Sequence, residues 1–155
     1  MRIGLISDTH GLLRPEVHGA LEGVELILHA GDVCGDTILD ELRLIAPVHA
    51  VYGNCDDPWT PGLSRQLDLV LGGLRVHVSH GHELGRPKPA QLAAAYDADV
   101  IVYGHTHVPV IERVGATLVV NPGSAGPRRF SLPATLAILT IADGHAEAAL
   151  VDLVT

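Results

Sequence analysis

The chain has 155 residues, 47% of them hydrophobic, so we expect residues 1–155 to form one domain with a substantial core. Ten lysines and arginines stand against 18 acidic residues, and the formal net charge of −8 disfavours a groove for duplex nucleic acid. No apolar stretch has the length of a membrane span or of a signal peptide, which favours a cytoplasmic protein without membrane contact. Two cysteines are too few for a disulfide scaffold, so reduced thiols are expected.

The first half of the chain alternates between predicted strands and helices. In order, we predict a strand over 2–7, a helix over 15–21, a strand over 25–29, a helix over 37–45 and a strand over 48–52. This βαβαβ order is typical of a parallel sheet, in which ligands gather beyond the carboxyl ends of the strands. Asp8, His10, Asp32 and Asn54 all stand at that predicted edge.

The second half carries more antiparallel signals. After a loop over 57–62 we predict strands over 66–71, 74–79, 100–103, 108–113, 117–120, 135–141 and 146–153, and a helix over 91–96. Gly72-Gly73 and Asp143-Gly144 are typical of hairpin turns. We therefore expect two packed sheets with helices outside them.

Two histidines follow the predicted strand 100–103, in the segment Gly104-His105-Thr106-His107. If the chain stays extended there, both imidazoles point the same way and face one pocket. For an isolated pair of this kind, a strand end that carries two histidines by chance is the more common explanation. Four further strand ends finish on residues that bind cations, and this favours a metal site.

The candidate ligands at the strand ends are Asp8, His10, Asp32, Asn54, His80, His105 and His107. Oxygen and imidazole donors without thiolate suit Mn, Fe, Co, Ni or Zn. Seven ligands are too many for one ordinary site. They fit two divalent ions roughly 3.5–4 Å apart that share a bridging carboxylate, an arrangement used for displacement at phosphorus.

The chain carries, in this order, Asp8-Thr9-His10, Gly31-Asp32, Gly53-Asn54, His80-Gly81-His82 and Gly104-His105-Thr106-His107. This series resembles the calcineurin-like metallophosphoesterase superfamily. The length, Gly53-Asn54-Cys55-Asp56 and Asn121-Pro122-Gly123-Ser124 are most similar to its small bacterial and archaeal phosphodiesterases. The resemblance implies an α/β fold, a four-layer αββα sandwich in which two mixed β-sheets pack face to face between flanking helices.

The resemblance also implies roles for the ligands. Asp8, His10 and His107 would bind the first ion. Asn54, His80 and His105 would bind the second, and Asp32 would bridge both. The implied cofactors are two divalent ions, with Mn²⁺ expected first and Fe, Ni, Co or Zn as alternatives.

The reaction implied is hydrolysis of a small phosphodiester by in-line attack of a metal-bridging hydroxide, with Asp32 and Asn54 in catalytic roles. Many relatives have histidine, a general acid, where this chain has Cys55. His82 and Asp56 are therefore weaker candidates for the acid. Arg128 and Arg129 are candidates for binding the substrate phosphate, and a solvated surface position is about equally expected.

Two other functions stay open. One is a non-catalytic interaction scaffold like the retromer subunit of this fold, which has altered site residues, whereas this chain has the full ligand set. The other is a phosphomonoesterase or nucleotide pyrophosphatase, because the loops around the metals select the substrate.

Several side chains outside the ligand set also carry expectations. His29 is expected to be buried, and His18, His49, His77 and His145 to lie on the surface or in packing. Cys34 and Cys55 are expected to be packing residues, with a redox-sensitive pair as a second hypothesis. The mean hydropathy of +0.29 suggests a homodimer.

Overall fold

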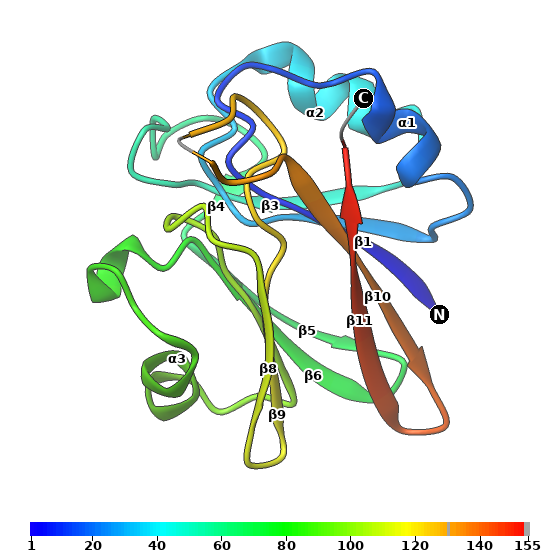
Figure 1. Cartoon of the computed structure of the whole chain (residues 1–155), viewed down its shortest axis with the longest axis vertical. Coiled ribbons are helices and arrows are strands. Elements are labelled where there is room, and N and C mark those ends of the chain that lie inside the picture. The colour runs from blue at the N-terminus through cyan, green and yellow to red at the C-terminus, as the bar shows by residue number, and fades with distance from the viewer. Residues whose placement is uncertain (130, 154–155) are drawn as a thin grey trace.

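Two mixed β-sheets pack face to face, with helices on both outer faces, in the computed structural model (Figure 1). The structure describes residues 1–129 and 131–153. Residues 130, 154 and 155 of the predicted single domain lie outside this range. The helices are α1 (Glu16–Ala20), α2 (Asp36–Arg43) and α3 (Pro89–Ala95), with the 3-10 turn η1 (His82–Leu84). None of them has the length and apolar character that crossing a membrane requires.

The first sheet has six strands. In spatial order they are β11 (His145–Asp152), β10 (Thr135–Ala142), β1 (Arg2–Ile6), β2 (Leu26–His29), β3 (Val48–Val51) and β4 (Leu63–Ser64). Strands β1, β2 and β3 are parallel, as the sequence predicts, because α1 and α2 form the crossovers between them. The two-residue strand β4 was not predicted.

The second sheet has five strands. In spatial order they are β5 (Gln66–Leu71), β6 (Leu74–Ser79), β7 (Val100–Val102), β9 (Thr117–Asn121) and β8 (Val110–Val114). The predicted hairpins β5–β6 and β10–β11 are antiparallel. Strand β7, however, runs parallel to both of its neighbours. Helix α3 forms the crossover from β6 to β7, and β8 lies between β7 and β9 in the chain.

The main core lies between the two sheets, where Leu5 and Leu28 pack with Val78 and Val102. Helices α1 and α2 cover the outer face of the first sheet, and α3 covers the outer face of the second. The observed architecture is therefore the four-layer αββα sandwich expected from the sequence (Figure 1).

Most predicted element boundaries lie within two residues of the observed ones. The largest shift at a strand start is at β8, predicted from residue 108 and observed from Val110. Pro109 has no N–H to donate to a ladder, which explains the later start.

Candidate metal centre

The loops after five strands bring all seven predicted ligand residues together. Asp8, His10 and His107 each offer a donor atom, and the three atoms lie within 4.8 Å of one another. Nε2 of His107 is 3.4 Å from Oδ1 of Asp8 and 3.3 Å from Nε2 of His10. The three residues that the resemblance assigns to the first ion thus form one cluster.

A second cluster lies beside the first. Donor atoms of Asp8, Asp32 and His80 also lie within 4.8 Å of one another. Oδ1 of Asn54 is 3.0 Å from Nε2 of His80 and 3.1 Å from Nδ1 of His105. The amide oxygen and the two imidazoles therefore converge from three different loops.

Asp32 lies between the clusters. Its Oδ2 is 3.5 Å from Nε2 of His10 and 3.3 Å from Nε2 of His80. Its Oδ1 accepts the backbone N–H of Cys55 at 2.9 Å, which fixes the orientation of the carboxylate. Oδ2 consequently faces both groups of histidines.

An unpartnered oxygen tests whether a cation fits here. Oδ1 of Asp8 is buried and has no hydrogen-bond partner. Oδ2 of the same carboxylate accepts hydrogen bonds from Oγ of Ser7 and the backbone N–H of His105. A buried carboxylate oxygen without a partner is unfavourable, and a bound cation would satisfy it. The oxygen and imidazole donors therefore fit divalent cations.

The backbone at the site is unusual. Asp8, His10, Asp32, His105 and His107 have φ values of 54°, 45°, 55°, 70° and 64°, in the left-handed region. Such conformations of residues other than glycine cost of order 1–3 kcal/mol each and collect at functional sites. The chain therefore does not stay extended after residue 103, and left-handed turns at His105 and His107 set the directions of the two imidazoles instead.

Two glycines allow the loops to approach closely. A Cβ at Gly53 would lie 2.0 Å from Oδ1 of Asp32, and one at Gly104 would lie 2.0 Å from Oγ of Ser7. Both distances are far below van der Waals contact. Larger residues at these positions would displace the carboxylates of Asp32 and Asp8.

The ionisation of the carboxylates suits cation binding. Burial opposes ionisation of Asp32, but the hydrogen bond and charge of His80 hold the pKa of Asp32 well below its usual range. His107 and His80 likewise outweigh burial and lower the pKa of Asp8. Nδ1–H of His80 donates to the carbonyl oxygen of Ala30 at 2.8 Å, which leaves Nε2 facing the carboxylates.

The weaker candidates occupy different places. His82 is half-buried, with its ring centroid 5.3 Å from that of His80. The carboxylate of Asp56 accepts the backbone N–H groups of Val33, Cys34 and Gly53, so it holds two loops together. With both oxygens engaged, Asp56 has a structural role in this state.

The two arginines are exposed and differ in their surroundings. Nε of Arg128 points to the carbonyl oxygen of Leu132 at 3.4 Å. The positive charge of Arg129 reaches His10 and Cys55. Both arginines stay candidates for binding the substrate phosphate.

The histidines outside the ligand set differ in burial. His29 is fully buried, as expected from the sequence, and His145 is exposed. His77 is buried in packing, where it stacks on Tyr96 with ring centroids 3.8 Å apart.

Two contacts of the ligand residues were not predicted from the sequence, and Cys34, expected to be a packing residue, is exposed. Ser7 donates to Asp8, and nothing in the pattern distinguishes it from other strand residues. Sγ of Cys34 lies 3.7 Å from Nδ1 of His10. Partial burial, with the negative charges of Asp56 and Asp32, raises the pKa of the Cys34 thiol to about 12.

Comparisons with known proteins show the family of this chain. Residues 1–144 match the model of the calcineurin-like phosphoesterase superfamily domain. The chain is 38% identical over 146 residues to a probable metallophosphoesterase of Methanothermobacter thermautotrophicus, covering 89% of this chain and 85% of the relative. It is 32% identical to a phosphodiesterase of Methanocaldococcus jannaschii, covering 90% and 92%.

A solved structure is also similar. Wild-type Vps29 of Entamoeba histolytica, complexed with Zn²⁺, superposes with a TM-score of 0.80 at 26% identity, and the match covers 99% of each chain. The fold, the motifs and the family match agree. The chain belongs to the calcineurin-like phosphoesterase superfamily.

Proposed function

We propose that this protein is a phosphodiesterase that uses two divalent metal ions, with Mn²⁺ as the first candidate. One observation carries the proposal: Oδ2 of Asp32 lies between two groups of donor atoms, 3.5 Å from His10 and 3.3 Å from His80. A carboxylate placed in this way can bind two neighbouring cations at once. The relatives named metallophosphoesterase and phosphodiesterase support the same reaction class.

We assign the ligands by cluster. Asp8, His10 and His107 would hold one ion, and Asn54, His80 and His105 the other, with Asp32 shared. Bound ions of this kind polarise phosphate oxygens and lower the pKa of water, so that attack on phosphorus occurs near neutral pH. The chain's own contribution is orientation.

Backbone groups of the chain fix the orientation of two of these ligands. The carbonyl oxygen of Ala30 fixes the tautomer of His80, and the N–H of Cys55 fixes the carboxylate of Asp32. Asn54 is neutral and therefore adds no negative charge that would repel the phosphate. We assign attraction of the phosphate to the positive charge of Arg129, which acts on His10.

Protonation of the leaving alcohol has no strong candidate. Both oxygens of Asp56 accept backbone N–H groups, and Cys55 stands where many relatives have histidine. His82 remains the better-placed weak candidate. Without an efficient general acid, diesters of acidic alcohols should react much faster than dialkyl phosphates, and a flat dependence of rate on leaving-group pKa would contradict this view.

Metal analysis combined with kinetics tests the proposal. Purified protein should contain close to two divalent ions per chain and hydrolyse bis(p-nitrophenyl) phosphate faster than p-nitrophenyl phosphate. Asp32→Ala and His80→Ala should lose both metal and activity, and the exposed control His145→Ala should keep both. Faster hydrolysis of the monoester, or of a nucleotide pyrophosphate, would favour those reactions instead.

A second candidate function is a non-catalytic interaction scaffold, and the likeness to Vps29 is the reason to test it. Metal-free protein, or activity that both ligand variants leave unchanged, would support the scaffold. The full set of seven donors favours the enzyme.

The homodimer and the cytoplasmic location also stay predictions. Sedimentation at several protein concentrations tests the dimer, and cell fractionation tests the location.

A further inference from the structure

A second set of metal-binding side chains adjoins the candidate metal centre. Cys34, Cys55 and His10 each offer one donor atom, and the three atoms lie within 4.8 Å of one another. Sγ of Cys34 is 3.7 Å from Nδ1 of His10, whereas Nε2 of the same ring faces Asp32 and His107. His10 therefore has one nitrogen in each cluster.

The two cysteines are held in place by their backbones. The N–H of Cys34 donates to Oδ1 of Asp56 at 2.8 Å, and the N–H of Cys55 donates to Oδ1 of Asp32 at 2.9 Å. Cys34 also has a left-handed backbone, with φ of 58°. These contacts fix two loops that are distant in sequence, so the thiols are close before any ligand binds.

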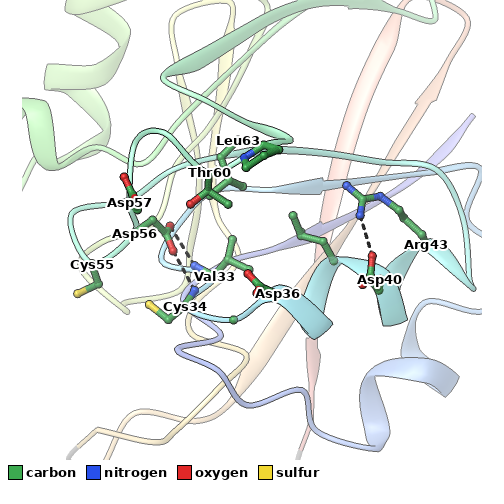
Figure 2. Close-up of a pocket in the computed structure, with 13 residues that line it drawn as sticks. Val33, Cys34, Asp36, Asp40, Arg43, Cys55, Asp56, Asp57, Thr60 and Leu63 are labelled. Atoms are coloured by element: carbon green, nitrogen blue, oxygen red, sulfur yellow. Dashed lines mark hydrogen bonds and ion pairs between the residues drawn. The ribbon is translucent and has the colours of Figure 1, made fainter.

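The thiols are accessible to an ion. Both cysteines are exposed. Figure 2 shows both sulfur atoms at one end of a pocket of about 440 Å³, away from the ion pair of Asp40 and Arg43 at the other end. The carboxylates of Asp32 and Asp56 lie beside them and add the negative charge that a cation requires.

The spacing fits a thiophilic cation. Zinc binds sulfur at about 2.3 Å and nitrogen at about 2.0–2.1 Å, which places the donors of a tetrahedral site roughly 3.5–4 Å apart. The 3.7 Å between Cys34 and His10 already lies in this range. Two thiolates and one imidazole would leave a fourth position for water. Thiolate also selects softer cations than the carboxylates do.

We propose that Cys34, Cys55 and His10 form a separate site for one thiophilic divalent cation of the zinc class, and that its occupation inhibits hydrolysis. When the metal–sulfur bonds form, the two thiol protons pass to solvent. When Nδ1 of His10 binds the cation, the single proton of the neutral ring resides on Nε2. A protonated Nε2 cannot bind the first metal ion. Binding of His10 to the thiophilic cation and binding of His10 to the first metal ion therefore exclude each other.

The inhibitory part rests on the proposed function, and the binding part does not. Cadmium is the probe, because its bonds to thiolate give an ultraviolet charge-transfer band that carboxylate and imidazole ligands do not give. The chain has only two cysteines, so the whole band reports on Cys34 and Cys55. The protein is kept reduced, and a count of two free thiols is verified before titration.

We expect one equivalent of Cd²⁺ to produce the band. Cys34→Ser and Cys55→Ser should each weaken Cd²⁺ binding by more than about 10-fold. Removal of a residue that only hydrogen-bonds to a metal ligand already costs about 10–100-fold in affinity, and these substitutions remove a ligand itself. His107→Ala, which removes a ligand from the first cluster only, should keep the band while it loses hydrolysis. No band in the reduced wild-type protein, or an unchanged band in Cys34→Ser, would overturn the site.

Inhibition is measured with Mn²⁺ in excess, each variant relative to its own rate without cadmium. Stoichiometric Cd²⁺ should inhibit the wild type, and Cys34→Ser should need more than about 10-fold more Cd²⁺ for the same fractional inhibition. Equal inhibition of both would refute competition through His10. A band in a protein that never hydrolyses phosphodiesters would refute the proposed function and leave the thiolate site standing.

Discussion

His29 makes the stability of this protein dependent on pH. Its side chain is fully buried at the end of β2. The N–H of Gly31 donates to Nδ1 at 3.1 Å, and Nε2 lies 3.1 Å from Oγ1 of Thr9. That hydroxyl donates to the carbonyl oxygen of Val33, so Nε2–H of His29 is the donor to Thr9. The neutral imidazole is satisfied at both nitrogens, and a proton on Nδ1 would face the N–H of Gly31.

The magnitude follows from the displaced pKa. Burial lowers the pKa of His29 from 6.5 to about 4. Lowering the pKa from 6.5 to about 4 corresponds to roughly 3.5 kcal/mol of stabilisation in total, at about 1.4 kcal/mol for each pH unit between the two values. Roughly 3 kcal/mol of this is lost by pH 4, because half of the folded molecules then carry the proton. Because the unfolded chain binds this proton first as the pH falls, the stabilisation is complete above pH 6.5. It is lost progressively as the pH falls from about 6.5 to about 4.

Urea unfolding of the metal-free protein between pH 7 and pH 4 measures this effect. His29→Asn keeps an acceptor oxygen for Gly31 and cannot bind a proton. The wild type should lose roughly 3 kcal/mol more of its free energy of unfolding across this range than His29→Asn does. The matched control His145→Asn, at an exposed histidine, should follow the wild type. Parallel curves for wild type and His29→Asn, or an NMR titration of His29 with a midpoint above pH 6, would refute the reasoning.

Three further outcomes are expected. Leu42→Ala removes a fully buried side chain of α2 and should lower the free energy of unfolding by about 2–5 kcal/mol in urea titration. The control Leu44→Ala, at an 83% exposed position, should change it by less than about 0.5 kcal/mol. Gly53→Ala places a methyl group 2.0 Å from Oδ1 of Asp32 and should weaken metal binding by about 10-fold or more in a competition titration. The control Gly19→Ala has open space around the added methyl group and should leave metal affinity unchanged. Metal held at 100 times its dissociation constant should add about 2.7 kcal/mol of stability per site, so a chelator should lower the melting temperature, and an unchanged melting temperature would contradict the metal centre.

Much of the fold was predictable because the information is local. Apolar runs separated by helical segments indicated the parallel order of β1, β2 and β3, and Gly-Gly and Asp-Gly turns indicated the hairpins. The parallel placement of β7 was not predicted, and neither was the pairing of β10 with β1. The pairing of β10 with β1 places Arg2 opposite Thr140, far away in the sequence. Side-chain periodicity shows which residues of a strand are buried, but it does not show which distant strand they pair with.

The candidate site divides in the same way. The residue types at the strand ends, taken alone, indicated carboxylate, amide and imidazole donors and therefore a metal centre. Only the tertiary structure decided that Asp32 faces both clusters and that five of the seven residues adopt left-handed turns. The contact of Cys34 with His10 likewise depends on two loops meeting in space. Chemical character belongs to each residue separately, whereas distances between side chains from five loops exist only once both sheets have packed.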